Sequence, residues 1–180
     1  MEKLLLDFSK ALFCLLQEKS LESISVGELC RKADYPRSTF YNHFHDINAL
    51  MDRCWESIRE QMIINDFQSI DNAERTAVLF DRIYDYMNGE REMIDRLLKF
   101  NSVDGAMFSS LNACIRRTIY RLIEECPFSY RYPMPENLVA KHYSNTVQMI
   151  LSACFLDKTT TKKEADAYIG FLLGTLEKAI

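Results

Sequence analysis

The sequence contains few of the residues that interrupt helices, with five glycines and four prolines among its 180 residues. A protein built from many short strands needs turn residues at regular intervals, so this shortage favours helices over a β-sandwich or barrel. No stretch reaches the ~18 uncharged apolar residues that a membrane span requires. Asp7 and Lys10 also interrupt the apolar N-terminus, which is unlike a signal peptide. We therefore expect an all-α, cytoplasmic protein with no membrane partner.

The sequence also lacks the motifs of catalysis and metal binding. Its six cysteines are scattered singly, with no C-x-x-C pair and no histidine at the spacing of a zinc ligand. Isolated cysteines of this kind are typical of buried thiols in a reducing compartment. No Ser-His-Asp or Cys-His arrangement and no phosphate-binding loop is visible either. These absences predict a protein that is not an enzyme and that needs no cofactor or metal.

Basic residues are outnumbered by acidic ones, and the formal net charge is −4. An acidic chain is not built over its whole surface for nucleic acid, but one face can still be basic. The segment RKADYPRSTFYNHF, residues 31–44, gathers basic and aromatic side chains and a histidine. The distribution of charge therefore marks this segment as a candidate binding surface.

Hydrophobic periodicity predicts a first helix over about residues 2–19. Ser25 and Glu28 then form the pattern of a capping box, in which each side chain accepts a hydrogen bond from the backbone N–H of the other residue. A second helix is expected to begin there. Pro36 disfavours helical geometry at the preceding residue and has no N–H to donate, so the second helix should end near Ala33.

The fixed φ of Pro36 suits a first helical turn, so a third helix should run from Arg37 to about His43. Asp46 offers the next N-cap, and a long fourth helix follows it. Two short helices around a tight turn are typical of a helix-turn-helix, whose second helix enters the major groove of DNA. Later helical segments, which bring the total to about nine helices, are expected at about 71–88, 90–101, 104–126, 135–156 and 162–178.

The third helix of this motif has two different faces. Phe40 and Phe44 are four residues apart and should point into a small core with Leu29 and the first helix. On the other face, a guanidinium group can reach phosphates or guanine edges, and hydroxyl groups can bind phosphates. The candidate DNA-contacting side chains of that face are Arg37, Ser38, Thr39 and Tyr41.

The segment ISVGELCRKADYPRSTFYNHFHDINALM, residues 24–51, resembles the DNA-binding domain of TetR/AcrR transcriptional regulators, and the resemblance covers about the first 55 residues. It implies an all-α homodimer with a helix-turn-helix DNA-binding domain in residues 1–45. Residues 46–180 would then form a helical ligand-binding and dimerisation domain. By position in the motif, the resemblance implies DNA contacts from Ser25, Arg37, Ser38, Thr39, Tyr41 and His43.

The segment departs from the usual family pattern at three positions. Asp34 replaces the turn glycine, which is tolerable because Asp adopts the left-handed conformation more readily than most residues. Pro36 replaces a serine that caps the recognition helix. Ile47 replaces a lysine that commonly holds phosphate at the start of the fourth helix. The last departure predicts a weaker grip on the DNA backbone.

The rest of the chain contains two further sets of candidate residues. Glycines 170 and 174, one turn apart in a terminal apolar helix, would allow another backbone to come close. We expect a homodimer interface there, formed by Tyr143, Val147, Ile150, Gly170, Leu173 and Gly174. Aromatic and methionine side chains could line an effector cavity, although at helical spacing they usually form core; the candidates are Trp55, Tyr84, Met87, Phe100, Met107, Phe108 and Tyr120.

Two functions fit these observations. The first is a dimeric transcriptional regulator, expected to be a repressor, that binds a near-palindromic operator in double-stranded DNA. Its affinity would change when a small-molecule effector enters the C-terminal domain. The alternative is a non-enzymatic co-regulator or protein-interaction module on the same scaffold, with DNA binding reduced by the departures at Pro36 and Ile47.

Overall fold

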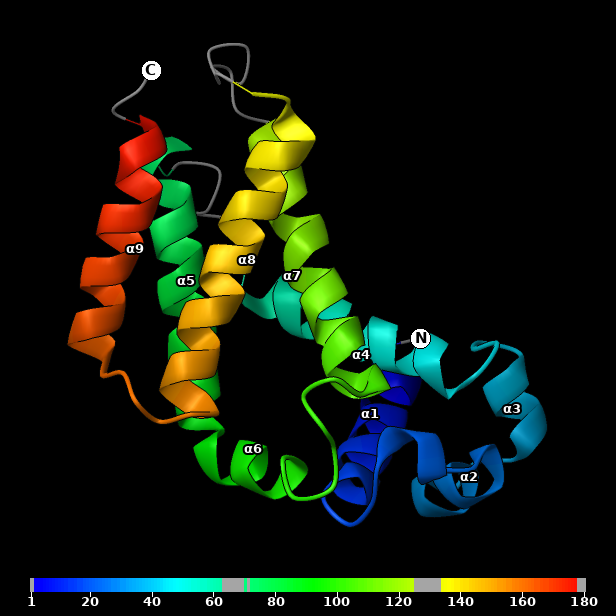
Figure 1. Ribbon diagram of the computed structural model, residues 1–180. Helices are drawn as coiled ribbons and strands as arrows, with labels where there is room; N and C mark the ends of the chain where they lie inside the picture. Colours follow the sequence, from blue (N-terminus) through cyan, green and yellow to red (C-terminus); the bar gives the residue numbers. More distant parts are fainter. Residues whose placement is uncertain (1, 63–69, 71, 125–133, 178–180) are drawn as a thin grey trace. The chain divides into compact units, whose positions relative to one another are not determined.

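The computed structural model of the protein describes residues 2–62, 70, 72–124 and 134–177. These residues form nine α-helices and one short 3-10 helix, and none of them lies in a strand (Figure 1). The expected all-α fold is confirmed. Within the described ranges, no helix combines the length and the apolar character needed to cross a membrane. In chain order the helices are α1 (Glu2–Leu16), η1 (Leu21–Ser23), α2 (Val26–Ala33), α3 (Arg37–Tyr41), α4 (Ile47–Met62), α5 (Asn72–Gly89), α6 (Arg91–Leu97), α7 (Ala106–Glu124), α8 (Glu136–Phe155) and α9 (Lys162–Glu177).

The helices pack into two compact units. The first unit contains residues 1–61 and 90–114, and the second unit contains residues 62–89 and 115–180. The first unit is therefore larger than the segment 1–45 predicted as a DNA-binding domain, because residues 90–114 return to it. The functional boundary at residue 45 stays a prediction.

Aromatic rings form the centre of the helix-turn-helix core in the first unit. The Phe8 ring centroid of α1 lies 5.5 Å from that of Phe40 and 5.9 Å from that of Phe44, both in edge-to-face geometry. Phe40 has no exposed surface and Phe44 is buried. The prediction that these two side chains point inward from the third helix is confirmed, and the opposite face of α3 is left at the surface.

Asn101 ties the end of α1 to the end of α6 within the first unit. Its side chain is 4% exposed. The Asn101 amide nitrogen donates to the carbonyl oxygens of Leu16, at 2.9 Å, and Leu97, at 3.0 Å. Its amide oxygen accepts from the Leu21 N–H at 3.0 Å. Because a buried backbone group without a partner is costly, this one side chain stabilises three chain segments at once.

A second connection within the first unit joins η1 to the start of α7. The Glu22 carboxylate accepts a hydrogen bond from the Ala106 N–H at 3.0 Å. That bond holds the pKa of the Glu22 carboxyl below its ordinary value. A carboxylate at the first turn of a helix is favourable because the free N–H groups there carry partial positive charge.

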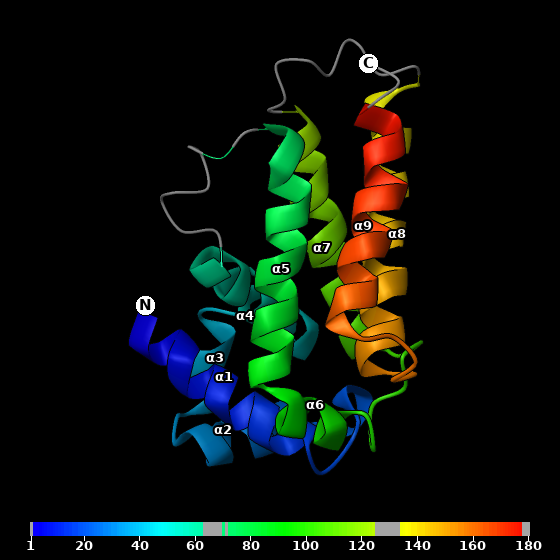
Figure 2. The ribbon, with the colours of Figure 1, turned by 90° about the vertical axis from the view of Figure 1, so that its left-hand side faces the viewer.

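In the second unit, α5 and α8 lie beside α9 (Figure 2). Val139, Val147 and Phe155 of α8 are almost completely buried. The Tyr84 ring of α5 lies 5.0 Å from that of Phe155. The apolar face of α8 therefore forms part of the core of this unit.

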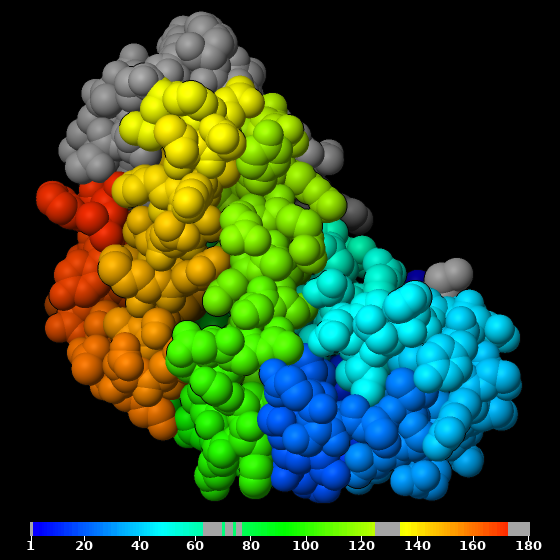
Figure 3. Space-filling model, turned by 45° about the vertical axis from the view of Figure 1, so that its right-hand side comes forward, coloured from blue at the N-terminus to red at the C-terminus, as the bar shows by residue number. Residues whose placement is uncertain are grey.

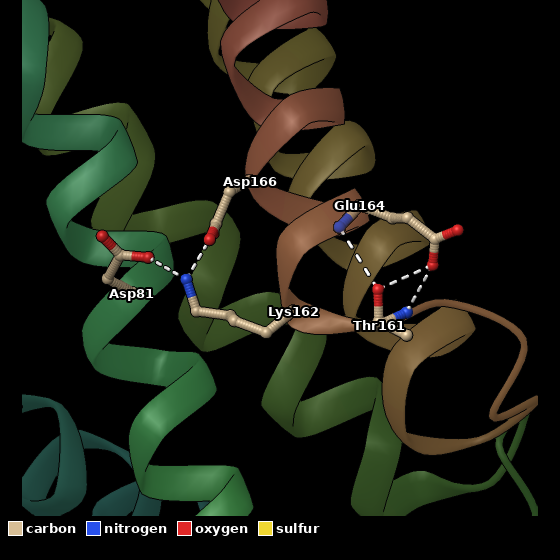
Figure 4. A network of polar contacts seen from close by, with 5 residues as sticks. All are labelled: Asp81, Thr161, Lys162, Glu164 and Asp166. Atoms are coloured by element: carbon tan, nitrogen blue, oxygen red, sulfur yellow. Dashed lines mark hydrogen bonds and ion pairs between the residues drawn. The ribbon is translucent and has the colours of Figure 1, made fainter.

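Polar contacts fix the N-terminal end of α9 (Figure 4). Thr161 and Glu164 form a capping box, because the Glu164 carboxylate accepts from the Thr161 N–H at 2.9 Å and the Glu164 N–H donates to the Thr161 hydroxyl at 3.4 Å. The ammonium group of Lys162 bridges Asp81 of α5 and Asp166 of α9. Burial acts to lower the pKa of Lys162, but the two carboxylates outweigh it and raise the pKa. The network joins α9 to α5 by charge as well as by apolar packing.

Candidate nucleic-acid interface

The candidate interface begins at the first turn of α2. Ser25 has extended backbone geometry at the N-cap, and its hydroxyl accepts from the Glu28 N–H at 3.2 Å. The Glu28 carboxylate accepts from the Lys19 ammonium at 2.7 Å, and this bond, with a smaller effect of the Ser25 N–H, keeps the Glu28 pKa below its ordinary value. The predicted cap at Ser25 is confirmed. Ser25 itself is exposed.

The turn between α2 and α3 depends on Asp34. This residue has φ 59° and ψ 44°, the left-handed conformation expected of the glycine that it replaces. The Tyr35 N–H donates to the Cys30 carbonyl, and the Tyr35 hydroxyl donates to Asp7 of α1 at 2.9 Å. The turn is thus held both by its own backbone and by α1.

Helix α3 is shorter than predicted and ends at Tyr41. Pro36 occupies the N-cap with φ −63° and makes no side-chain cap, while its carbonyl accepts from the Thr39 N–H at 3.0 Å. Beyond Tyr41 the chain continues as a turn, in which the His43 N–H donates a hydrogen bond to the carbonyl of Phe40, three residues earlier.

The predicted DNA-contacting residues lie on the accessible surface of this motif. Arg37, Ser38 and His43 are exposed, Tyr41 is 58% exposed, and Thr39 is half-buried. In the space-filling view the segments of α2 and α3, drawn in blue and light blue, form one continuous surface (Figure 3). Five of the six candidate side chains are therefore exposed to solvent, and Thr39 is partly covered.

The start of α4 presents a carboxylate and no cation. Asp46 accepts from the Ala49 N–H at 2.8 Å, which confirms the predicted cap. That bond, followed by the contact with His45, lowers the pKa of Asp46. Ile47 is half-buried and offers no group that binds phosphate. This end of the surface is consequently less attractive to DNA than one with a lysine at position 47.

A shallow concavity of about 450 Å³ lies between α2 and α3. Arg31 and Arg37 bring positive charge to its edge, and Asp34 brings one negative charge. The Cys30 thiol in its wall is buried, which raises the thiol pKa, although the nearby guanidinium of Arg37 opposes the rise. The concavity is thus bordered by two guanidinium groups and is open to solvent.

The residues predicted to line an effector cavity are divided between the two units, and the six besides Trp55 fall three to each unit. Three belong to the first unit, where Met107 and Phe108 are buried and Phe100 is 45% exposed. The other three, Tyr84, Met87 and Tyr120, belong to the second unit. Within the described ranges, no three His, Cys, Asp or Glu side chains are grouped so that they could hold a metal ion.

The remaining effector candidate, Trp55 of α4, has a buried polar group. Its ring packs edge-on against Phe13 at 5.6 Å, and its side chain is 9% exposed. The indole N–H is buried and has no hydrogen-bond partner among the described residues. Buried donors are nearly always satisfied, so the Trp55 N–H is an exception among the described residues.

The predicted dimer residues divide into two groups. Tyr143, Val147 and Ile150 are each at most 3% exposed inside the second unit. They are therefore core residues of the subunit and do not form a free surface, which corrects their assignment to a contact with a second chain. The sequence pattern shows that α8 has a broad apolar face, but it does not show whether that face packs within the subunit or against a second chain.

The remaining dimer candidates lie in α9. Gly170 is exposed, and a Cβ added there would meet nothing within 4 Å. The surroundings of Leu173 and Gly174 lie outside the described residues. Among the described residues of α8 and α9, the large apolar side chains that are exposed are Leu138, Met149, Tyr168 and Phe171.

Comparison with known proteins identifies similar folds. A TetR family transcription regulator from Shewanella sp. PV-4 matches with a TM-score of 0.59 and 11% sequence identity, over 96% of this chain and 97% of that chain. A TetR family regulator from Vibrio parahaemolyticus matches with a TM-score of 0.54 and 12% identity, over 95% and 97%. RolR, crystallised without ligand, matches with a TM-score of 0.53 and 16% identity, over 94% and 89%.

No protein-family model matches the sequence, and a comparison with curated proteins finds no match either. The structural likenesses therefore establish the fold, with a helix-turn-helix followed by further helices, and do not by themselves establish a function.

Proposed function

We propose that the protein is a dimeric transcriptional regulator that binds a near-palindromic DNA operator through α2 and α3. The observation that carries this proposal is the division of α3 into two faces. Phe40 anchors the helix in an aromatic core, while Arg37, Ser38 and Tyr41 remain at the surface with polar groups suited to DNA. The fold shared with TetR family regulators supports the same function.

The exposed side chains of the motif have distinct expected roles. Arg37 makes no hydrogen bond or ion pair with any described residue, so all its donors are available to a guanine edge or a phosphate. Tyr41 projects a hydroxyl from a rigid ring and suits a phosphate. Ser25 and Ser38 would add weaker contacts to the backbone of the same strand.

The proposed dimer uses the exposed faces of α8 and α9. Phe171 is 69% exposed and Met149 is 57% exposed, and a second chain would cover such apolar groups. The open space at Gly170 would let a partner helix approach closely. Sedimentation of the wild-type protein at micromolar concentration should show a dimer. Phe171→Asp should yield monomer, whereas Val103→Asp, at another exposed apolar residue in the first unit, should leave the dimer intact.

A small-molecule effector and a repressor role are further parts of the proposal. The buried Trp55 N–H offers a donor to a ligand with a carbonyl or carboxylate. One of the similar structures is described as being without ligand, which fits a ligand-binding relative. Because the chain has a single tryptophan, quenching or a shift of its fluorescence during a compound screen would identify ligands that reach this site.

The alternative function is a co-regulator that binds another protein and contacts DNA weakly. The start of α4 favours it, because Asp46 and Ile47 stand where a cation would hold phosphate. Weak binding that shows no preference among DNA sequences would support this alternative.

Fluorescence anisotropy with duplex DNA from the protein's own promoter region tests the proposal. Arg37→Ala should weaken binding by about 1–3 kcal/mol, and the matched exposed variant Arg116→Ala should not. Tyr41→Phe removes one hydroxyl and should weaken binding to all sequences alike. Each lost phosphate contact should make the slope of log K against log salt concentration shallower by ~0.9. Unchanged affinity, slope and preference in both folded variants would contradict the proposal.

A further inference from the structure

Arg37 and Gly27 occupy one site on the surface of the helix-turn-helix. Gly27 lies in the first turn of α2 and is buried. A Cβ built on Gly27 would overlap the Arg37 Nη2 atom and would lie 2.9 Å from Cζ and 3.0 Å from Nε. The guanidinium of α3 therefore fills the space that any other side chain at position 27 would take.

Among the helical glycines whose surroundings the structure describes, only Gly27 has this space filled by another side chain. At Gly89 and Gly170, both of which also lie in helices, an added Cβ meets nothing within 4 Å. Alanine is the better helix former, so the glycine at position 27 is not explained by helix stability. Its backbone φ is not positive either, so no left-handed turn requires it. The close approach of the Arg37 side chain is what the missing Cβ permits.

The side chain that lies over Gly27 still has its full capacity to bind. None of the described residues accepts a hydrogen bond from the Arg37 guanidinium or forms an ion pair with it. Packing against α2 restricts where the group lies without using its five N–H donors. An arginine that is already restricted loses less entropy when it binds and presents its donors in a defined direction.

We propose that Gly27 is a positioning residue for DNA recognition: by leaving room for the guanidinium over α2, it sets where Arg37 meets the DNA and so determines the base preference at one position of each half-site. The inference rests on the proposed DNA-binding function and adds to it the residue that directs Arg37. In this proposal α2 affects sequence preference indirectly, because Gly27 of α2 positions the Arg37 side chain of α3.

A double-mutant cycle tests this inference. The full-length wild-type protein would first enrich duplexes from a library with a random central segment, and the best duplex would then be titrated with Gly27→Ala, Arg37→Ala, the double variant and the control Gly89→Ala. Gly27→Ala should stay folded, because the atoms that an added Cβ would meet belong to the end of the Arg37 side chain and not to the backbone. It should lose about 5- to 150-fold in affinity and change preference at the same base pair as Arg37→Ala. In the Arg37→Ala background, Gly27→Ala should change affinity less than about twofold.

The outcomes separate the inference from the function on which it rests. If the wild type prefers certain sequences but Gly27→Ala binds like Gly89→Ala, or if the effect of Gly27→Ala persists without Arg37, the positioning role is wrong while the regulator proposal stands. If the wild type enriches no sequence, both fail. A measurement without DNA adds a further check: the Arg37 Nε–H resonance should move in Gly27→Ala and not in Gly89→Ala, and an unmoved resonance would overturn the proposed packing.

Discussion

Removing the Asn101 side chain should destabilise the first unit strongly. In Asn101→Ala, the Leu16 carbonyl and the Leu21 N–H lose their only partners among the described residues. The Leu97 carbonyl keeps two backbone hydrogen bonds, from the N–H groups of Phe100 and residue 101. Each buried group left without a partner costs about 1–3 kcal/mol, so the free energy of unfolding should fall by about 2–6 kcal/mol. That is a large fraction of the roughly 5–15 kcal/mol that stabilises a typical domain.

Urea unfolding followed by tryptophan fluorescence measures the stability of the first unit, which contains Asn101. Trp55 is the only tryptophan and packs on Phe13 in the same unit as Asn101. Asn88→Ala, at an exposed position of α5, is the matched control and should behave like the wild type. Asn101→Asp keeps the shape but turns the donor toward two carbonyl oxygens into a carboxylate oxygen, so it should be at least as destabilising as alanine. Equal urea midpoints for Asn101→Ala and Asn88→Ala would refute the reasoning.

Two other predictions follow from single side chains. Asp46→Ala removes the N-cap of α4 and should lower the free energy of unfolding by about 1 kcal/mol, whereas Asn48→Ala nearby should not. The Asp46 pKa is lowered below its ordinary 3.8, so this contribution is complete above that pH and is lost as the pH falls through the folded value. In urea titrations the difference between wild type and variant should therefore shrink as the pH is lowered below 3.8. Cys54 is 1% exposed, and burial raises the pKa of its thiol to about 11. Mass spectrometry after thiol labelling at pH 8 should therefore find Cys14, which is half-buried, modified well before Cys54. Equal labelling of the two thiols in the folded protein would contradict the assigned burial.

Local signals in the sequence were enough to predict the helix-turn-helix. The caps at Ser25 and Asp46 and the left-handed turn at Asp34 each depend on residues within a few positions of one another. The inward direction of Phe40 and Phe44 follows from their spacing on one helical turn. These features are local, so the order of residue types determines them without knowledge of the rest of the fold.

Long-range features could not be predicted in the same way. Two partners of Asn101, Leu16 and Leu21, lie 85 and 80 residues earlier in the chain, and no periodic pattern reports such contacts. Tyr143, Val147 and Ile150 of α8 were assigned to a contact with a second chain, but they pack inside the subunit. An apolar helix face in the sequence does not show which surface covers it. The packing of Arg37 on Gly27 depends on how α2 and α3 meet, which spacing alone does not give. The sequence therefore predicted which residues form the candidate site, and the structure supplied the contacts that hold Arg37 and the caps in place.

The most direct test of the central claim is the selection of DNA from a random-sequence library by the full-length protein, with sequencing of the bound duplexes. The proposed function predicts enrichment of an inverted repeat whose half-site centres lie ~34 Å or a somewhat larger distance apart, bound by two chains per duplex. Arg37→Ala in a folded protein should lose preference at one base pair of each half-site. Bound duplexes with no common sequence, or an enriched sequence that Arg37→Ala and Tyr41→Phe bind as the wild type does, would contradict the assignment of α2 and α3 to DNA recognition.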